Sequence, residues 1–149
     1  MSLKEKIKDD IKQAMRDKNE SRLGTLRMLS AAIQRREVDE RIQLDDTQVI
    51  VVIEKLVKQG RESIEQYVKG GRQELADKES SEIALYQAYL PQQLSEAEVD
   101  KLVVEAIASA GASSIKDMGK VMGVLKSRLQ GRADMGQVGS KVKARLGAA

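Results

Sequence analysis

The chain of 149 residues has no cysteine, histidine, tryptophan or phenylalanine. Without cysteine it forms no disulfide, and without histidine it holds neither a histidine-ligated zinc site nor a Ser-His-Asp triad. We therefore expect no catalytic residues, no metal and no cofactor. The three tyrosines are the only aromatic residues, which predicts an aliphatic core of the kind that packs between helices.

Long apolar runs are also missing. The longest uninterrupted stretches are a few residues, such as Val49–Ile53, whereas a membrane-spanning helix needs about 20. The N-terminus is charged and amphipathic and does not resemble a secretory signal. We expect a soluble, cytoplasmic protein with no membrane partner.

The net charge of +3 is unevenly distributed. Residues 1–91 are balanced, residues 92–110 have a net charge of −3, and residues 111–149 have a net charge of +6. Basicity is therefore a property of the C-terminal tail. Such asymmetry suggests a polyanionic partner, although a mildly basic solvated surface would also account for it.

The first part of the chain contains four segments with apolar residues at helical spacing. A capping box is predicted at Ser2 with Glu5, and Asn19 or Ser21 caps the second helix. Asp45 or Asp46 caps the third helix, and Gln48 completes a box with Asp45. We expect the first helix to run to about Lys18. The second buries Leu23, Leu26, Leu29, Ile33 and in one reading Val38. The third passes through Gly60, where a kink is plausible, and the fourth ends at Pro91.

Three shorter helices are predicted after Pro91. Ser95 with Glu98 forms another capping box, and Gly111 ends the first of the three. The second begins near Ser114, and Asp134 caps the third. No strand is needed anywhere. The sequence thus predicts an all-α protein, with a helical N-terminal domain of about four helices over residues 1–92 and a three-helix domain over 93–149.

The segment Gly131–Gln137 has the glycine spacing of the first half of a phosphate-binding loop. Gln137 stands where that loop needs lysine, and a helix rather than a strand precedes it. A turn fits better, with Gly131 closing one helix in the left-handed conformation and Asp134 capping the next.

Basic side chains in the last two helices are the candidate binding residues. Lys141 and Arg145 share one helical face, and several lysines and arginines precede them. Such a cluster can neutralise phosphates, and neighbouring glycines let a sugar–phosphate backbone approach. The alternative is a solvated face, with glycines needed for close helix packing. The predicted nucleic-acid-binding residues are Lys120, Arg132, Lys141, Arg145, Gly119 and Gly136.

Several motifs, in order along nearly the whole chain, resemble the GatB/YqeY family, in particular its stand-alone YqeY-like members. They are Thr25–Ile33, Lys58–Ile64, Gly71–Leu75, Tyr89–Leu94, Asp117–Gly123, Gly131–Asp134 and Val142–Leu146. The resemblance implies a helical N-terminal domain followed by a three-helix tail domain. One departure is Gly60, where the family pattern leads us to expect a basic residue.

The resemblance also implies a partner. In the B subunit of tRNA-dependent amidotransferases, the similar tail domain packs against tRNA, while the kinase-like cradle and the amidase subunit are separate parts. This chain is too short to contain either part. The family's carbon–nitrogen ligase activity, with glutamine as the amido-nitrogen donor, is therefore not expected of this chain alone.

Two functions remain open. The first is a non-catalytic tRNA-binding or structured-RNA-binding accessory protein. The alternative is a helical adaptor that docks through its charge-balanced N-terminal domain on a synthetase, an amidotransferase or another protein. A self-contained amidotransferase is disfavoured, because the sequence has neither the cysteine nor the nucleotide loop that such an enzyme would use.

Overall fold

The computed structural model describes residues 1–147, and in that range it consists of helices and their connections without a strand. The all-α prediction is confirmed. None of the described helices is both long and apolar enough to cross a membrane. The helices are α1 (Leu3–Arg16), α2 (Glu20–Glu40), α3 (Asp46–Lys69), α4 (Gln73–Gln87), α5 (Glu96–Ala110), the 3₁₀ helix η1 (Ile115–Asp117), α6 (Met118–Leu129) and α7 (Met135–Gly147).

The chain divides into two compact units, which we call the N-terminal unit (Met1–Leu90) and the C-terminal unit (Pro91–Ala149). The N-terminal unit contains α1 to α4, and the C-terminal unit contains α5, η1, α6 and α7. The domain boundary expected between residues 92 and 93 lies close to this division. That residues 1–92 and 93–149 are the two domains of the protein stays a prediction.

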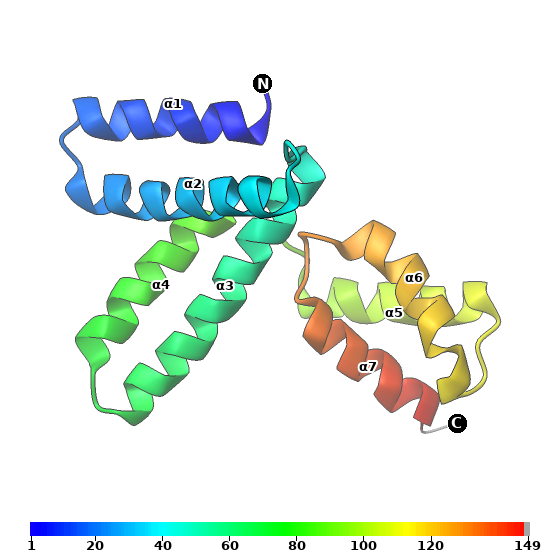
Figure 1. The fold of residues 1–149 in the computed structure, drawn as a ribbon. Coiled ribbons are helices and arrows are strands. Elements are labelled where there is room, and N and C mark those ends of the chain that lie inside the picture. The colour runs from blue at the N-terminus through cyan, green and yellow to red at the C-terminus, as the bar shows by residue number, and fades with distance from the viewer. Residues whose placement is uncertain (148–149) are drawn as a thin grey trace. The chain divides into compact units, whose positions relative to one another are not determined.

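Two helical hairpins build the N-terminal unit: α1 lies alongside α2, and α3 lies alongside α4 (Figure 1). The aliphatic core expected from the composition lies where the hairpins meet, with two tyrosines from the end of α4 at its margin. Its buried members are Ile7, Ala14, Leu26, Leu29, Ile33, Leu44, Val49, Val52, Ile53, Val57, Ile83, Tyr86 and Tyr89.

Local sequence signals set the ends of these helices. The Ser2 and Asp45 capping boxes are both present, with each cap side chain accepting a hydrogen bond from the backbone N–H three residues on. Helix α1 ends at Arg16, slightly before the predicted Lys18, and Asn19 caps α2. The chain makes this reversal with Lys18 at a positive φ of 54°.

Helix α3 runs through Gly60 without interruption, and this glycine is buried against α4. A Cβ atom added at Gly60 would lie 2.9 Å from Cγ1 of Ile83. No side chain fits there without displacing Ile83. The basic residue expected at this position from the family pattern is therefore incompatible with this packing.

The sequence reading that placed Val38 in the buried stripe of α2 is wrong, because this side chain is 68% exposed. At 100° per residue, Val38 lies about 180° around the helix from Leu29 and about 140° from Ile33. Those two residues are buried, so Val38 is directed to solvent.

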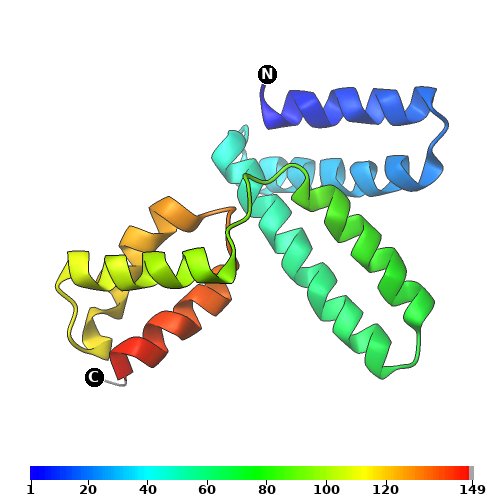
Figure 2. The same ribbon diagram turned by 180° about the vertical axis from the view of Figure 1, so that it is seen from behind.

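In the C-terminal unit, α5 contacts both α6 and α7, and α6 contacts α7 (Figure 2). Ser95 caps α5 by accepting from the Glu98 N–H, which is one of the two hydrogen bonds of the predicted capping box, and Gly111 ends α5 at a φ of +64° as predicted. The 3₁₀ turn before α6 was not predicted. The buried core consists of Val99, Val103, Ala106, Val121, Leu125, Leu129, Val138, Val142 and Leu146.

The turn between α6 and α7 has the structure expected for Gly131 and Asp134. Gly131 adopts a φ of +79°, a conformation that other residues rarely take. The Asp134 side chain accepts from the Gly136 N–H at 2.9 Å at the start of α7. The glycine pattern of this segment thus belongs to a helix–turn–helix connection.

Candidate nucleic-acid interface

All six predicted binding residues lie in the C-terminal unit, on two helices and the turn between them. Gly119 and Lys120 are in the first turn of α6, Arg132 is in the turn, and the other three are on α7. Among the described residues, no side-chain hydrogen bond or ion pair joins any two of the six. The structure therefore assembles them on one small unit but gives each a different environment.

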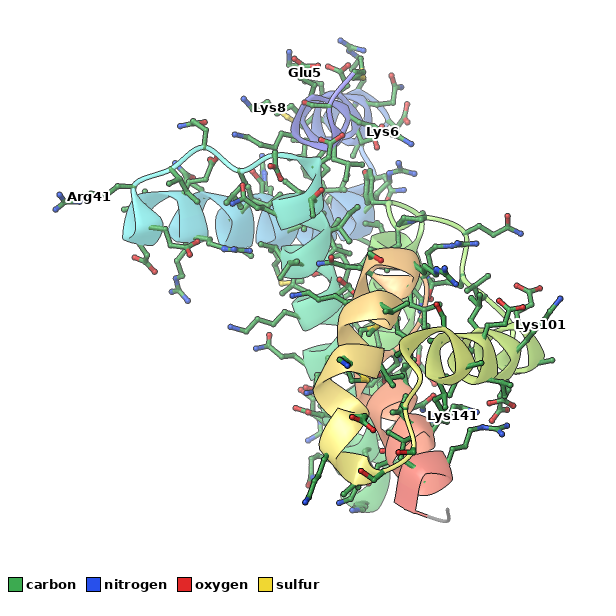
Figure 3. All side chains as sticks on the ribbon, turned by 90° about the vertical axis from the view of Figure 1, so that its right-hand side faces the viewer. Glu5, Lys6, Lys8, Arg41, Lys101 and Lys141 are labelled. Carbon is green, nitrogen blue, oxygen red and sulfur yellow. The ribbon has the colours of Figure 1, made fainter. Side chains whose placement is uncertain are left out.

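Lys141 is already partnered within the unit. Its Nζ lies 2.6 Å from Oδ1 of Asp100 and 3.2 Å from Oε1 of Glu96, both on α5. Figure 3 shows its side chain between α7 and α5. The hydrogen bond to Asp100, followed by the one to Glu96, raises the pKa of Lys141. A phosphate would have to compete with these carboxylates for the ammonium group.

Arg132 is half-buried, and it is tied to the segment that precedes α5. Its Nε donates to the carbonyl of Gln92 at 3.4 Å, and its own carbonyl accepts from the Leu94 N–H at 2.9 Å. Gln93 Nε2 donates to the neighbouring Gly131 carbonyl at 2.5 Å. Arg132 thus has a structural role that the sequence did not reveal.

Lys120 and Arg145 are exposed and form no ion pair with any described residue. The positive charge of Lys120 contributes to lowering the pKa of Asp117, after the larger effect of hydrogen bonds from the Ser113 and Ser114 N–H groups. Lys143, which was not among the predicted binding residues, is also exposed and also forms no ion pair with any described residue. No local sequence signal distinguishes it from Lys141, because the side of α7 that faces α5 depends on contacts between distant residues.

The glycines of α6 and α7 are not needed for close helix packing. A Cβ atom added at Gly119 or at Gly123 would meet nothing within 4 Å, so the backbone of α6 is bare there. A Cβ atom added at Gly139 would lie 3.8 and 3.9 Å from the methyl carbons of Met118 and Met122, which is an ordinary van der Waals distance. Close packing therefore requires glycine at none of these three positions.

The acidic segment of the sequence lies in the same unit as the basic tail. Counted together, residues 91–149 carry nine basic and six acidic side chains, a net charge of +3, and four of the six acids are on α5. Because Asp100 and Glu96 pair with Lys141, the α5 side of α7 is neutralised locally. The basic side chains of α6 and α7 other than Lys141 have no ion-pair partner among the described residues, and they include Arg145, one turn from Lys141.

Metal chemistry finds no support in the described part of the chain, where no group of three or more acidic side chains is placed to hold an ion. That the protein uses no metal or cofactor stays a prediction.

A second candidate site lies in the N-terminal unit, in the angle between α2 and α3. It is a groove of about 730 Å³ with an apolar floor and charged margins. Met28 and Val51, on opposite walls, remain 46% and 38% exposed. Its lining is Met28, Ala31, Ala32, Arg35, Arg36, Asp39, Glu40, Val51, Val52, Lys55, Leu56 and Gln59.

Comparison with known proteins identifies one family model and several similar proteins that share one name. A family model described as "Yqey-like protein" matches residues 4–146. Proteins named "Altered inheritance of mitochondria protein 41, mitochondrial" are similar to the chain. The one from Pyrenophora tritici-repentis is 30% identical over 96% of this chain and 80% of its own length.

Two further relatives with the same name match over shorter regions. The protein from Eremothecium gossypii is 41% identical over 56% of this chain and 46% of its own length. The protein from Vanderwaltozyma polyspora is 31% identical over 75% of this chain and 64% of its own length. The chain thus spans less than two thirds of these two relatives.

The expectation of a cytoplasmic protein is contradicted by this comparison. All three relatives carry the word mitochondrial in their names, which points to mitochondria rather than the cytoplasm. The expectation came from the absence of apolar runs, and that absence distinguishes soluble from membrane-spanning proteins without distinguishing one aqueous compartment from another.

Proposed function

The chain belongs to the YqeY-like family, and on that premise we propose that it is a non-catalytic RNA-binding protein whose C-terminal unit contacts the phosphate backbone of tRNA. The observation that carries the proposal is the set of exposed basic side chains on α6 and α7 that lack an ion-pair partner among the described residues. They are Lys120, Lys126, Arg128, Lys143 and Arg145.

The bare backbone of α6 supports the same function. Gly119 lies beside Lys120, and Gly123 lies one turn further along the same exposed side. A phosphate oxygen can therefore approach the helix more closely than side chains usually allow, while nearby ammonium groups balance its charge. Gly136 is exposed at the start of α7, but its N–H already donates to Asp134, and a Cβ atom added there would lie 3.1 Å from Oδ1 of Asp134. It therefore has a secondary place in the proposal.

Arg132 and Lys141 contribute less to the proposed RNA contact, because both are already engaged within the unit. Arg132 would contact RNA only with the part of its guanidinium group that is not engaged with Gln92. Lys141 would contact RNA only after leaving Asp100 and Glu96. We therefore place the main contacts at Lys120 and Arg145. The link to tRNA-dependent amidotransferases rests on the sequence resemblance of the tail domain, and the names of the relatives extend the proposal to a mitochondrial tRNA.

Filter binding of bulk tRNA over about 50 to about 300 mM salt tests this function. Each lost phosphate contact lowers the steepness of the plot of log affinity against log salt by about 0.7 to 0.9. We expect Lys120→Glu with Arg145→Glu to reduce it by about 1.4 to 1.8. The matched control is Arg27→Glu with Lys58→Glu, which makes the same charge change at exposed positions of the N-terminal unit. Absence of binding at the lowest salt, or equal slopes for both variants, would refute the proposal.

The groove between α2 and α3 favours a second candidate function, that of a protein adaptor. An exposed apolar strip within a unit of balanced charge is typical of a protein-binding surface rather than of an RNA-binding one. Pull-down from nuclease-treated extract tests this function, since a protein retained without RNA is expected only of an adaptor.

A further inference from the structure

Helix α2 presents apolar residues on two sides. Leu26, Leu29 and Ile33 are buried in the core of the N-terminal unit. Met28 and Ala31, which line the groove, are exposed on another side of the helix. A surface helix that only covers a core has one apolar stripe and an otherwise polar surface. The second apolar side of α2 is therefore not explained by the fold of this unit.

The groove has the dimensions of a short helix. Its lining extends from Met28 to Glu40 on α2 and from Val51 to Gln59 on α3. At 1.5 Å per residue these walls are about 18 and 12 Å long, which fits a helix of about eight to twelve residues. Only two helices line the groove, so it does not enclose a ligand in the way that small-molecule sites do.

The charges at the margins indicate the chemistry of the occupant. Arg36 is engaged with Glu40 at 2.6 Å and with the Gln48 carbonyl at 3.3 Å. Arg35 on the α2 wall and Lys55 on the α3 wall have no ion-pair partner among the described residues. Asp39 is the only acidic residue of the groove lining that also lacks an ion-pair partner among the described residues. A cation on each of the two helices that line an apolar groove complements a ligand with an apolar stripe flanked by carboxylates.

We infer that this groove binds a short amphipathic helix of a partner protein, with apolar side chains at i, i+3/i+4 and i+7 and acidic side chains beside them. The inference rests on the adaptor function proposed above and names the partner's chemistry. A second copy of this chain is a poorer occupant. The groove has twelve lining residues, whereas stable protein interfaces have about 20 to 30 residues on each side.

The direct test uses a fluorescein-labelled synthetic helix of about twelve residues, with leucines at the stated spacing and glutamates beside them. Binding to the full chain is followed by fluorescence anisotropy. We expect Val51→Asp to weaken binding at least about tenfold by placing a carboxylate in the apolar lining of the groove. Val68→Asp is the matched control, because Val68 is another exposed valine of α3 that does not line the groove.

The charge requirement has its own pair of variants. Lys55→Glu should weaken binding of the glutamate peptide and strengthen binding of a peptide with lysines in place of the glutamates. Lys58→Glu, on the same helix outside the groove lining, should change neither. Equal binding of both peptides to the wild-type chain would overturn the acidic part of the inference, and no binding of either, or unchanged binding to Val51→Asp, would overturn the whole.

Two further measurements separate this inference from the adaptor function itself. Light scattering of the unliganded chain reports a second copy, since dimers that Val51→Asp abolishes would assign the groove to self-association and overturn the inference. In the nuclease-treated pull-down, a protein retained equally by the wild-type chain and Val51→Asp supports an adaptor function and overturns its assignment to the groove. Thermal unfolding of each variant, followed by circular dichroism, verifies that it is folded.

Discussion

The two units differ in how their charges are used. In the N-terminal unit, acidic and basic side chains balance, and pairs such as Lys4 with Glu37 connect segments far apart in the chain. In the C-terminal unit, basic side chains outnumber acidic ones, and those on α6 and α7 apart from Lys141 have no ionic partner among the described residues. The N-terminal unit therefore exposes an apolar groove, whereas the C-terminal unit exposes basic side chains without an ionic partner among the described residues. This difference argues for two kinds of partner, one for each unit.

The largest expected effect concerns whether the units are separable. Leu29 and Leu125 are fully buried in the two separate cores. Replacing either with alanine should cost about 3 kcal/mol of unfolding free energy. We expect Leu125→Ala to lower amide-exchange protection in α5, α6 and α7 only, and Leu29→Ala to do so in α1 to α4 only. Equal losses in both units from either variant would show that they unfold together.

A smaller effect on stability should distinguish Gly60, which packs against α4, from Gly24, where an added Cβ atom meets no neighbour. Gly60→Ala should destabilise the protein by about 1 to 2 kcal/mol, because overpacking against Ile83 exceeds the gain in helix propensity. Gly24→Ala, where the added Cβ meets nothing, should stabilise it by about 0.5 to 1 kcal/mol. Urea unfolding measures both changes. A stabilising Gly60→Ala would contradict the close approach of α4.

The next effect concerns the ion pairs of Lys141 in the C-terminal unit and their influence on tRNA affinity. Asp100→Asn with Glu96→Gln should release Lys141 and remove two negative charges, and so raise affinity for tRNA about fivefold at low salt. The control, Glu20→Gln with Glu62→Gln, makes the same net change at exposed positions of the N-terminal unit. If both pairs raise affinity equally in filter binding, net charge matters and the location of Lys141 does not.

The smallest effect is a difference in acid sensitivity between the units. The hydrogen bond from Lys4, and then that from the Leu44 N–H, lowers the pKa of Glu37 below its usual 4.5. The Ser113 and Ser114 N–H groups lower the pKa of Asp117 below 3.8. Both groups stabilise the fold above their unfolded pKa, and this stability is lost as pH falls through the folded value.

The loss should therefore begin at a higher pH in the N-terminal unit, and Glu37→Gln should make its stability less dependent on pH. Thermal melts between about pH 6 and about pH 3 measure this effect. An unchanged pH dependence in Glu37→Gln would contradict the role of the Lys4–Glu37 pair.

Much of the fold could be predicted because its signals are local. The Ser2 and Asp45 caps, the left-handed Gly111 and the Gly131 turn each depend on residues within a few positions of one another. The prediction for Val38 failed for a related reason. The apolar period of α2 continues on a second side, and spacing alone does not say which side is buried.

The candidate site was less predictable because it depends on contacts between distant residues. Lys141 is 41 positions from Asp100 in the sequence, and Gly60 is 23 positions from Ile83. No local sequence pattern predicts that carboxylates of another helix neutralise a lysine on a basic face. Nor does one predict that a helical glycine accommodates a side chain of another helix. The groove likewise exists only because α2 and α3 meet at an angle.

The hydrogen bonds of Gln93 and Leu94 to the α6–α7 turn have a consequence for limited proteolysis. A protease needs to draw its substrate chain into an extended conformation, so backbone that is held by internal hydrogen bonds resists cleavage. Residues 92–94 are not helical, yet they are held to Gly131 and Arg132. This segment should therefore survive digestion longer than its glutamine-rich, helix-free sequence suggests.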